Sequence, residues 1–425
     1  MEKNKRIIQV DERVPLAKGI PLSIQHTFAM FSASVLVPYL LGINASIVLL
    51  MNGIGTLIFI FMTKGKAPAY LGSSFAFISP ALLIIANPNM GYEYAIGGFV
   101  VTGIVMTLIA IIIKFVGTKW IGILLPPAAM GPIIALIGLE LAGTAAQSGG
   151  LILTDTYTSI NVDFVIVFLV TITVAVFGQV LFRGFAAAIA ILIAIVVGYL
   201  TASSLGIVDF SVVSNAPMFE VPNFLMPKFS VEAILITVPA ALVVISEHIG
   251  HQVVTSEIVG RDLIKDPGLH RSLAADGIST TLSGFCGSVP TTTYGENIGV
   301  MAITKVYSVW VIGGAAVFSI ILAWIGKASA LINTIPAPVM GGISFLLYGM
   351  IAASGLRLLV DEKVDYSKAR NLALSSVVFV TGLSGAFIQI GSVQLKGMAL
   401  ATIVGIALGL IFFIIDKFGL ANDKE

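Results

Sequence analysis

The sequence predicts an all-α polytopic membrane protein, and three observations lead to this fold class. Hydrophobic residues make up 57% of the 425 residues, charged residues only 11%, and the mean hydropathy is +1.03. A soluble domain carries about a quarter charged residues. Apolar stretches of roughly 20 residues, the length of a spanning helix, recur along the whole chain. The net charge of +1 gives no case for nucleic acid as a partner.

The chain begins with a polar segment, residues 1–20, whose basic residues include Lys3, Lys5 and Arg6. This segment lacks the apolar stretch and the small-residue cleavage site of a signal peptide, so we expect it to remain as a cytoplasmic tail. The spans that follow lie near 22–41, 46–63, 92–114, 121–142, 161–181, 184–206, 231–253, 271–288, 306–327, 336–357, 371–390 and 396–416.

Two further apolar segments, 70–86 and 290–304, are short and rich in Ser, Gly, Thr and Pro. Counting both gives about fourteen transmembrane segments, seven in each half. If the N-terminus is cytoplasmic and all segments cross, 20 of the 23 basic residues fall on the cytoplasmic side. Since the positive-inside rule predicts such an asymmetry, we expect a multi-pass protein of the cell membrane with both termini in the cytoplasm. The three basic residues that fall on the external side are Lys228, Lys327 and Lys396.

The two halves carry similar motifs in the same order. Asn-Gly-Ile-Gly-Thr at 52–56 resembles Asp-Gly-Ile-Ser-Thr at 276–280, and Pro68 and Pro290 open the two short segments. A unit with an odd number of spans that is repeated once must lie upside down relative to its copy, which is the inverted-repeat architecture of many secondary transporters. The two short segments, 70–86 and 290–304, are the third and tenth of the fourteen, and their Ser, Thr, Tyr and Phe residues also favour short strands near the midplane. The other matches are 125–131 with 335–341 and 183–184 with 396–397.

Ionisable residues inside the spans are the candidates for function, because they are costly to bury in a membrane. Glu247 and His251 are four residues apart, so they share a helix face and can share a proton. Glu296 and Asn297 lie in the second short segment, where irregular backbone must be enclosed by protein or line a cavity. Together they indicate a site for a small polar solute, although a structural hydrogen-bonded pair remains the alternative for Glu247 and His251.

Other polar residues have weaker claims. The order Glu-His-x-x-His at 247–251 differs from the His-Glu-x-x-His of zinc proteases and has no obvious third ligand, so a metalloenzyme is disfavoured. We expect Glu140 and Asp276 to be structural and His270 to face water. The role of His248 stays open. Cys286 is the only cysteine and forms no internal disulfide.

These motifs resemble the nucleobase–ascorbate transporter family, and within it the bacterial uracil permeases. Residues 296–305 fit the family signature [Gln/Glu/Pro]-Asn-x-Gly-x-x-x-x-Thr-[Arg/Lys/Gly]. Gln25 and His26 fit the Gln-His pair of the first span. Residues 69–77 resemble the first broken segment of the family, and residues 247–251 resemble the Glu-His-x-x-His stretch of the uracil permeases.

The resemblance implies a fold in two parts and a homodimer. After the tail, residues 21–119 and 229–328 would form the two halves of a core domain, segments 1–4 and 8–11. Residues 120–228 and 329–425 would form the two halves of a gate domain, segments 5–7 and 12–14 with a short C-terminal tail.

The resemblance also implies a proton-coupled uracil importer, a uracil:H⁺ symporter that works by alternating access and is driven by a proton gradient without another cofactor. Glu247 and Glu296 would hold the base, and Glu247 with His251 would couple it to protons. Gln25, His26 and Asn297 would support the site. The remaining pocket residues implied by the resemblance are Phe75, Gly295, Ser74, Tyr294, Tyr348 and Ala33.

The chemistry of the residues agrees with this substrate. Uracil is a planar ring with two N–H donors, which carboxylates can accept, and two carbonyls, to which backbone N–H groups at broken segments can donate. A site built on polar groups rejects analogues that leave those groups unpaired. The alternatives are a permease for xanthine, urate or another nucleobase, and an anion exchanger or channel of the same architecture. A basic residue at the breaks would favour an anion, and none is present there.

Overall fold

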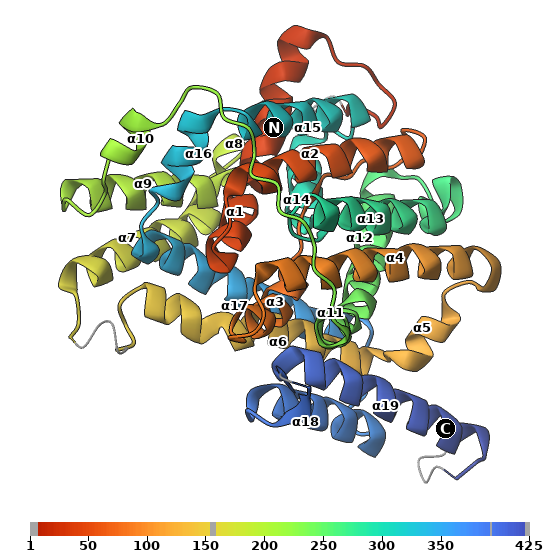
Figure 1. Ribbon diagram of the computed structural model, residues 1–425. Coiled ribbons are helices and arrows are strands. Elements are labelled where there is room, and N and C mark those ends of the chain that lie inside the picture. Colours follow the sequence, from red (N-terminus) through yellow and green to blue (C-terminus); the bar gives the residue numbers. More distant parts are fainter. Residues whose placement is uncertain (1–6, 154–158, 392, 421–425) are drawn as a thin grey trace.

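The computed structural model describes residues 7–153, 159–391 and 393–420, and almost all of its regular structure is helical (Figure 1). The basic residues Lys3, Lys5 and Arg6 of the N-terminal tail lie outside the described residues, as does the end of the C-terminal tail. Within the described part, eight helices are long and apolar enough to cross a membrane, and four shorter apolar helices accompany them. The expected class, a polytopic helical membrane protein, is confirmed.

The first half of the chain contains ten helices, one strand and a short 3₁₀ turn among the described residues. In order these are α1 (Leu16–Leu41), α2 (Ala45–Met62), β1 (Leu71–Ser73), η1 (Phe75–Phe77), α3 (Ile78–Ile85), α4 (Tyr92–Val116), α5 (Lys119–Leu124), α6 (Pro127–Ser148), α7 (Val162–Leu181), α8 (Phe185–Ala188), α9 (Ala190–Ser204) and α10 (Ser211–Asn215).

The second half follows with a comparable series and one additional hairpin. Its elements are α11 (Val231–Thr237), α12 (Pro239–Val259), a π turn η2 (Ile264–Gly268), α13 (Leu269–Phe285), β2 (Thr291–Thr293), α14 (Gly295–Thr304), α15 (Val309–Ala323), α16 (Gly326–Asn333), α17 (Ala337–Asp361), α18 (Ala369–Leu383), β3 (Phe387–Ile390), β4 (Val393–Lys396) and α19 (Gly397–Lys417).

Local sequence explains where several helices begin and end. Asn44 caps α2, because its side-chain oxygen accepts the Ser46 N–H at 2.9 Å. Pro126 and Pro336 precede α6 and α17, and both helices have proline in the first turn, where its missing N–H costs nothing. The helix α1 ends at Gly42, whose φ of 67° is a left-handed conformation that glycine adopts readily.

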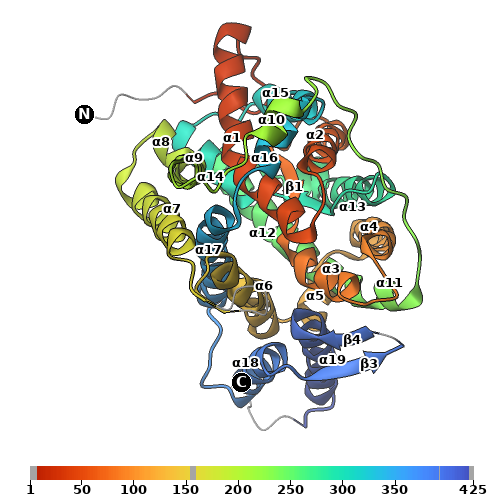
Figure 2. The same ribbon diagram turned by 60° about the vertical axis from the view of Figure 1, so that its left-hand side comes forward.

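One predicted span extends too far. The sequence predicts a span over 371–390, but α18 ends at Leu383, and Gly385 follows with a φ of 74°. The chain then forms the hairpin of β3 and β4, in which Phe387 pairs with Lys396, and this hairpin lies beside α19 (Figure 2). A positive φ ends a helix regardless of the apolar residues that follow it.

The helices form two groups. In one, α4 packs on α13, α2 on α15 and α13, and α1 on α15. In the other, α17 packs on α6, α7 and α9, while α18 and α19 pack on each other and on α6. Figures 1 and 2 both place α18 and α19 far from α2 and α15. The groups meet where α1 contacts α9 and α12 contacts α19 and α6.

The packing partners recur with the two halves exchanged. The pair α4–α13 matches α15–α2, because each joins the fourth segment of one half to the second segment of the other. In the second group, α7–α17 likewise matches α18–α6, and α9–α17 matches α19–α6. Each of these helix pairs in one direction therefore has a counterpart in which the two halves of the chain exchange places.

Two short antiparallel strands lie at the centre of the first group. In the interior, β1 and β2 lie side by side: Leu71 pairs with Thr293, Gly72 with Thr292 and Ser73 with Thr291. Both strands are buried along their whole length. Each short segment thus begins as a strand, as the sequence predicts, and continues as a helix.

Candidate functional site

Two threonines fix the starts of the central strands. The Thr56 hydroxyl of α2 accepts the Leu71 N–H at 2.9 Å, and the Thr280 hydroxyl of α13 accepts the Thr291 N–H at 3.2 Å. These threonines occupy the last positions of the two matched motifs, 52–56 and 276–280. The structure thus brings the motifs into equivalent contacts.

The ends of the strands are fixed in the same reciprocal way. The Ser74 N–H donates to the Pro290 carbonyl at 2.9 Å, and the Tyr294 N–H donates to the Tyr70 carbonyl at 3.2 Å. The next residue in each segment, Phe75 or Gly295, begins a helix. The first N–H groups of a helix have no partner inside it, so they are available to a bound molecule.

A cavity of about 290 Å³ lies where these elements meet α12 and α17. Four elements or junctions line it: the end of β1, the middle of α12, the junction of β2 with α14, and one face of α17. The lining residues are Ser73, Phe75, Glu247, His251, Thr292, Thr293, Tyr294, Gly295, Glu296, Leu347, Met350, Ile351 and Ser354.

Two carboxyl groups from different helices line this cavity. Glu247 comes from α12 and Glu296 from the first turn of α14, and both side chains are partly buried. The salt bridges within the described part of the chain do not include either one. Since an unpaired carboxylate is costly to bury, the pair points to a ligand that presents hydrogen-bond donors.

Close packing surrounds the carboxyl groups. A Cβ atom at Gly295 would lie 3.2 Å from Nε2 of His251, so glycine allows the imidazole to approach the start of α14. The Tyr294 hydroxyl donates to the Ser73 carbonyl at 2.9 Å and joins the two broken segments. In α1, the His26 Nδ1 lies 2.8 Å from Asn297 Oδ1, which fixes the first turn of α14 from the other side.

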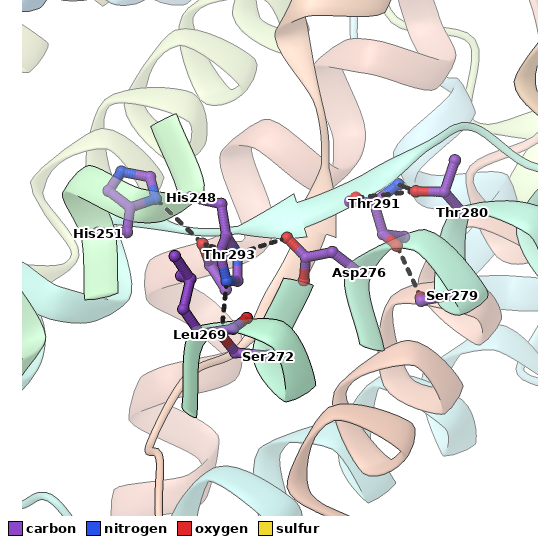
Figure 3. A network of polar contacts seen from close by, with 9 residues as sticks. All are labelled: His248, His251, Leu269, Ser272, Asp276, Ser279, Thr280, Thr291 and Thr293. Atoms are coloured by element: carbon purple, nitrogen blue, oxygen red, sulfur yellow. Dashed lines mark hydrogen bonds and ion pairs between the residues drawn. The ribbon is translucent and has the colours of Figure 1, made fainter. Parts of the chain in front are cut away.

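A buried polar network lies behind the cavity (Figure 3). The His251 Nδ1 contacts the Thr293 hydroxyl at 3.2 Å, so the cavity residue is held by β2. The Nδ1 of His248 contacts Asp276 Oδ2 at 2.8 Å, and its Nε2 contacts the Ser272 hydroxyl at 2.9 Å. The histidine with no assigned role is thus one half of a fully buried imidazole–carboxyl pair that joins α12 to α13.

Several residues implied by the resemblance lie outside the cavity lining. Ala33, Ser74 and Tyr348 are almost completely buried in the packing around the site, and Gln25 is buried in α1. Glu140, expected to be structural, accepts the Met398 N–H at 3.0 Å and so caps α19. The cavity itself is lined by six of the implied residues: Phe75, Glu247, His251, Tyr294, Gly295 and Glu296.

None of the four α17 residues that line the cavity could be predicted from the sequence, and Tyr348, the one residue of this helix that the resemblance implies, is buried outside the lining. Leu347, Met350 and Ile351 are ordinary apolar residues of a spanning helix, and Ser354 is common in such helices. Nothing in their pattern separates a face that lines a cavity from one that faces lipid. Thr292 and Thr293 could have been found, because they belong to the threonine run that opens the second short segment.

A second cavity of about 330 Å³ adjoins the first and shares Glu296 and Met350 with it. It follows α14 past Gly299 to Ile303, towards the end of the helix at Lys305. On the opposite side, a cavity of about 310 Å³ near Tyr39 and Asn333 shares no lining residue with the site. The site cavity therefore adjoins a second cavity along α14 and shares no lining residue with the cavity near Tyr39.

The described residues contain no group of three or more His, Cys, Asp or Glu side chains placed to hold a metal ion. The cavity contains hydrogen-bond donors and acceptors beside the Phe75 ring, and such a combination can bind a small polar molecule.

Comparison with known proteins identifies the family. Residues 17–391 match the Permease family. The chain belongs to this family. It is 58% identical to the uracil permease of Paenibacillus larvae over 98% of this chain and 99% of that protein. Identity with the uracil permease of Bacillus subtilis is 48%, over 97% and 96% of the two chains. The resemblance to the bacterial uracil permeases of the nucleobase–ascorbate family is confirmed, and the protein is a permease, not an enzyme.

More distant relatives and solved structures share the architecture. The putative pyrimidine permease RutG of Escherichia coli is 37% identical over 95% of this chain and 92% of its own. The transmembrane domain of a cyanobacterium bicarbonate transporter, BicA, superposes with a TM-score of 0.65 at 13% identity, covering 96% and 99% of the two chains. The murine anion transporter Slc26a9 in the inward-facing state superposes with a TM-score of 0.73 at 12% identity, covering 96% and 69%. At these identities the two structures establish the fold alone.

Proposed function

We propose that this protein is a uracil:H⁺ symporter of the cell membrane that imports uracil by alternating access. The observation that carries the proposal is the convergence of Glu247 and Glu296 with the helix starts at Phe75 and Gly295 on one cavity. Near full-length identity of 58% to proteins named uracil permease supports this substrate.

The geometry suits a planar ring with two donors and two acceptors. The N–H groups of uracil would donate to the carboxylates of Glu247 and Glu296, and its carbonyls would accept from the backbone N–H groups of Phe75 and Gly295. The Phe75 ring would cover one face. In this proposal Tyr294 lines the pocket, and Ser74, Tyr348 and Ala33 shape it from behind, which agrees with their burial.

Glu247 and His251 would couple transport to protons. They lie on one face of α12, and both line the cavity. A proton taken up by Glu247 would remove a buried negative charge and so favour closure of the site, whereas its loss would favour release of uracil. The proton gradient would then drive accumulation.

The proposed architecture has fourteen segments in a seven-plus-seven inverted repeat. The exchanged packing pairs, the equivalent bonds of Thr56 and Thr280 and the matching starts of α6 and α17 all support it. Residues 21–119 and 229–328 would form the core domain, and residues 120–228 and 329–425 the gate domain. The separation of the helices into two packed groups supports this division.

We also propose cytoplasmic termini and a homodimer. The basic-residue asymmetry supports the orientation, and with it the second cavity, near Lys305, faces the cytoplasm. The site would then be open to the inside and closed to the outside.

Competition binding tests the substrate. Labelled uracil is bound to the purified protein and displaced with unlabelled uracil, xanthine, adenine or cytosine. Displacement by uracil alone is expected, because each analogue leaves at least one polar group of the site unpaired. Displacement by xanthine would keep the mechanism and overturn the substrate. No binding of any base would contradict the proposal and return attention to an anion, which two unpaired carboxylates at the site disfavour.

A further inference from the structure

A groove of about 410 Å³ between α1 and α15 has no part in the proposed transport cycle. It is lined mainly by apolar and small side chains, and a single charged residue, Arg13, lies at its mouth. Leu16 and Trp310 at the rim are 78% and 53% exposed, so this surface faces the surroundings of the protein rather than its core. Further along, the walls are formed by Gly19, Gly314 and Phe318.

Two hydrogen bonds join α1 and α15 along the groove. The Ser23 hydroxyl of α1 donates to the Val311 carbonyl at 2.8 Å, and the Thr27 hydroxyl donates to the Ala315 carbonyl at 3.2 Å. Trp310 and Phe318 are eight residues apart, so the groove runs about 12 Å along the helix axis.

Backbone contacts hold the segment that carries Arg13. The Val10 carbonyl accepts the Val309 N–H at 2.9 Å, and the Glu12 carbonyl accepts the Ser308 hydroxyl at 2.6 Å. Val10 is completely buried. The Arg13 guanidinium lies 4.3 Å from the centre of the Trp310 ring, so the cation is held over the indole at the mouth of the groove.

The positive charge of Arg13 is not neutralised by the neighbouring carboxylates. Asp11 pairs with Arg261 at 2.7 Å, and this hydrogen bond holds the pKa of Asp11 below its usual range. Glu12 Oε2 accepts the Gln9 N–H at 3.4 Å. Among the residues that the structure describes, Arg13 forms no ion pair. Stacking on an aromatic face leaves the guanidinium edge, with its N–H donors, available.

We propose that this groove binds one anionic phospholipid of the bilayer, with its phosphate on Arg13 and an acyl chain along Gly19 and Gly314. A phosphate matches the donors of a guanidinium edge. Basic pockets between spanning helices bind anionic headgroups, and tryptophan lies preferentially at the membrane interface. The apolar groove behind the cation distinguishes a lipid from a free phosphate.

Trp310 is a natural reporter of this site, because the protein contains only three tryptophans. We would replace Trp120 and Trp324 with phenylalanine and reconstitute the full chain in phosphatidylcholine vesicles. Brominated phosphatidylglycerol or brominated phosphatidylcholine would then be added at equal mole fraction to quench the fluorescence of Trp310. The expected relative affinity is about fivefold in favour of the anionic lipid, the effect of one basic residue.

Three variants decide the proposal. Arg13→Gln should remove the preference for the anionic lipid, while Lys18→Gln, which removes an exposed charge from the same region without touching the groove, should keep it. Gly19→Leu should fill the groove and reduce quenching by both lipids, without a change in charge. Equal quenching by both lipids in the parent protein, or equal loss of preference in Arg13→Gln and Lys18→Gln, would overturn the proposal.

Discussion

Glu296 combines two properties that make it the most informative residue of the site. It lies in the first turn of α14, where a negative charge is favoured by the helix dipole, and it lines the cavity without a salt bridge to any described residue. A ligand that donates to this carboxylate therefore meets an acceptor that is already oriented.

The first prediction concerns this carboxylate. We expect Glu296→Ala to weaken uracil binding about 10- to 150-fold, the loss of a hydrogen bond to a charged group. Glu296→Gln should lose less affinity for uracil, because its amide oxygen still accepts one hydrogen bond. Titration calorimetry on the purified variants measures both. Glu362→Gln, an exposed residue at the end of α17, is the control and should bind as the parent does. Unchanged affinity in Glu296→Ala would remove this residue from the site.

The second prediction separates binding from proton coupling at Glu247. Glu247→Gln imitates a permanently protonated carboxyl group, so it should retain exchange of uracil across the membrane but lose accumulation driven by an imposed proton gradient. Proteoliposomes loaded with unlabelled uracil measure exchange, and empty ones under a pH gradient measure accumulation. His270→Gln, at the start of α13 and away from the cavity, should affect neither. Equal loss of both activities in Glu247→Gln would assign Glu247 to binding alone.

At this scale the sequence could predict the residues whose chemistry is unusual for a membrane. Glu247, His251 and Glu296 stand out because ionisable groups are costly there. Met350 and Ser354 could not be predicted, because an apolar wall of a cavity has the same composition as a lipid-facing surface. The partnership of His248 with Asp276 was also hidden, since it depends on how α12 and α13 cross.

At the scale of elements, the paired strands depend on two equivalent hydroxyl groups. Thr56 and Thr280 each satisfy the first backbone N–H of a strand in a fully buried position. Their adjacent glycine or serine residues permit close contact between α2 and α13, since a Cβ at Gly55 would collide with Ser279. Each half of the chain thus contains an equivalent anchor for its strand.

The third prediction tests this anchor. Thr56→Val and Thr280→Val should each lower the free energy of unfolding by roughly 1–3 kcal/mol, because each leaves a buried backbone N–H unsatisfied. The serine variants keep a hydroxyl group at each position, so Thr56→Ser and Thr280→Ser should retain most of the free energy of unfolding. Thermal unfolding in detergent gives the comparison. Thr63→Val is the matched control, since its buried hydroxyl contacts only carbonyls of its own helix. A loss in Thr63→Val as large as in the other two would refute a special role for the anchors.

The sequence could predict these elements only in part. Threonine and serine runs next to glycine and proline indicated strands in the two short segments, and the strands are present. The end of α18 was missed, because residues 387–390 are as apolar as the helix before them. What ended the helix was the backbone conformation of Gly385, which composition does not reveal.

At the scale of the whole molecule, the site lies between two groups of helices that share few contacts. The strands, α12 and α14 approach it from one side and α17 from the other. Movement of one group against the other would change the α17 wall while leaving the carboxylates and strand ends together. This arrangement fits the proposed alternating access, and in the proposed orientation the adjoining cavity lies on the cytoplasmic side of the site.

The fourth prediction uses that direction. In a Cys286→Ala background, single cysteines replace Ile303, which is 43% exposed in the cavity that adjoins the site, and Asn333, which lines the cavity on the opposite side. A charged, membrane-impermeant thiol reagent should reach Ile303→Cys from the cytoplasmic side only, because the cavity that adjoins the site opens to the cytoplasm in the proposed orientation. It should reach Asn333→Cys from the external side only.

Uracil should slow the labelling of Ile303→Cys, because a bound base beside Glu296 narrows the path that both cavities share, and should leave Asn333→Cys unaffected. Right-side-out and everted vesicles provide the two orientations. Val380→Cys, whose parent residue is 65% exposed on the outer surface of α18, should resist the reagent from both sides if that surface faces lipid. Reaction of Ile303→Cys from the external side without uracil would mean that the site is open to both faces, and alternating access would have to be abandoned.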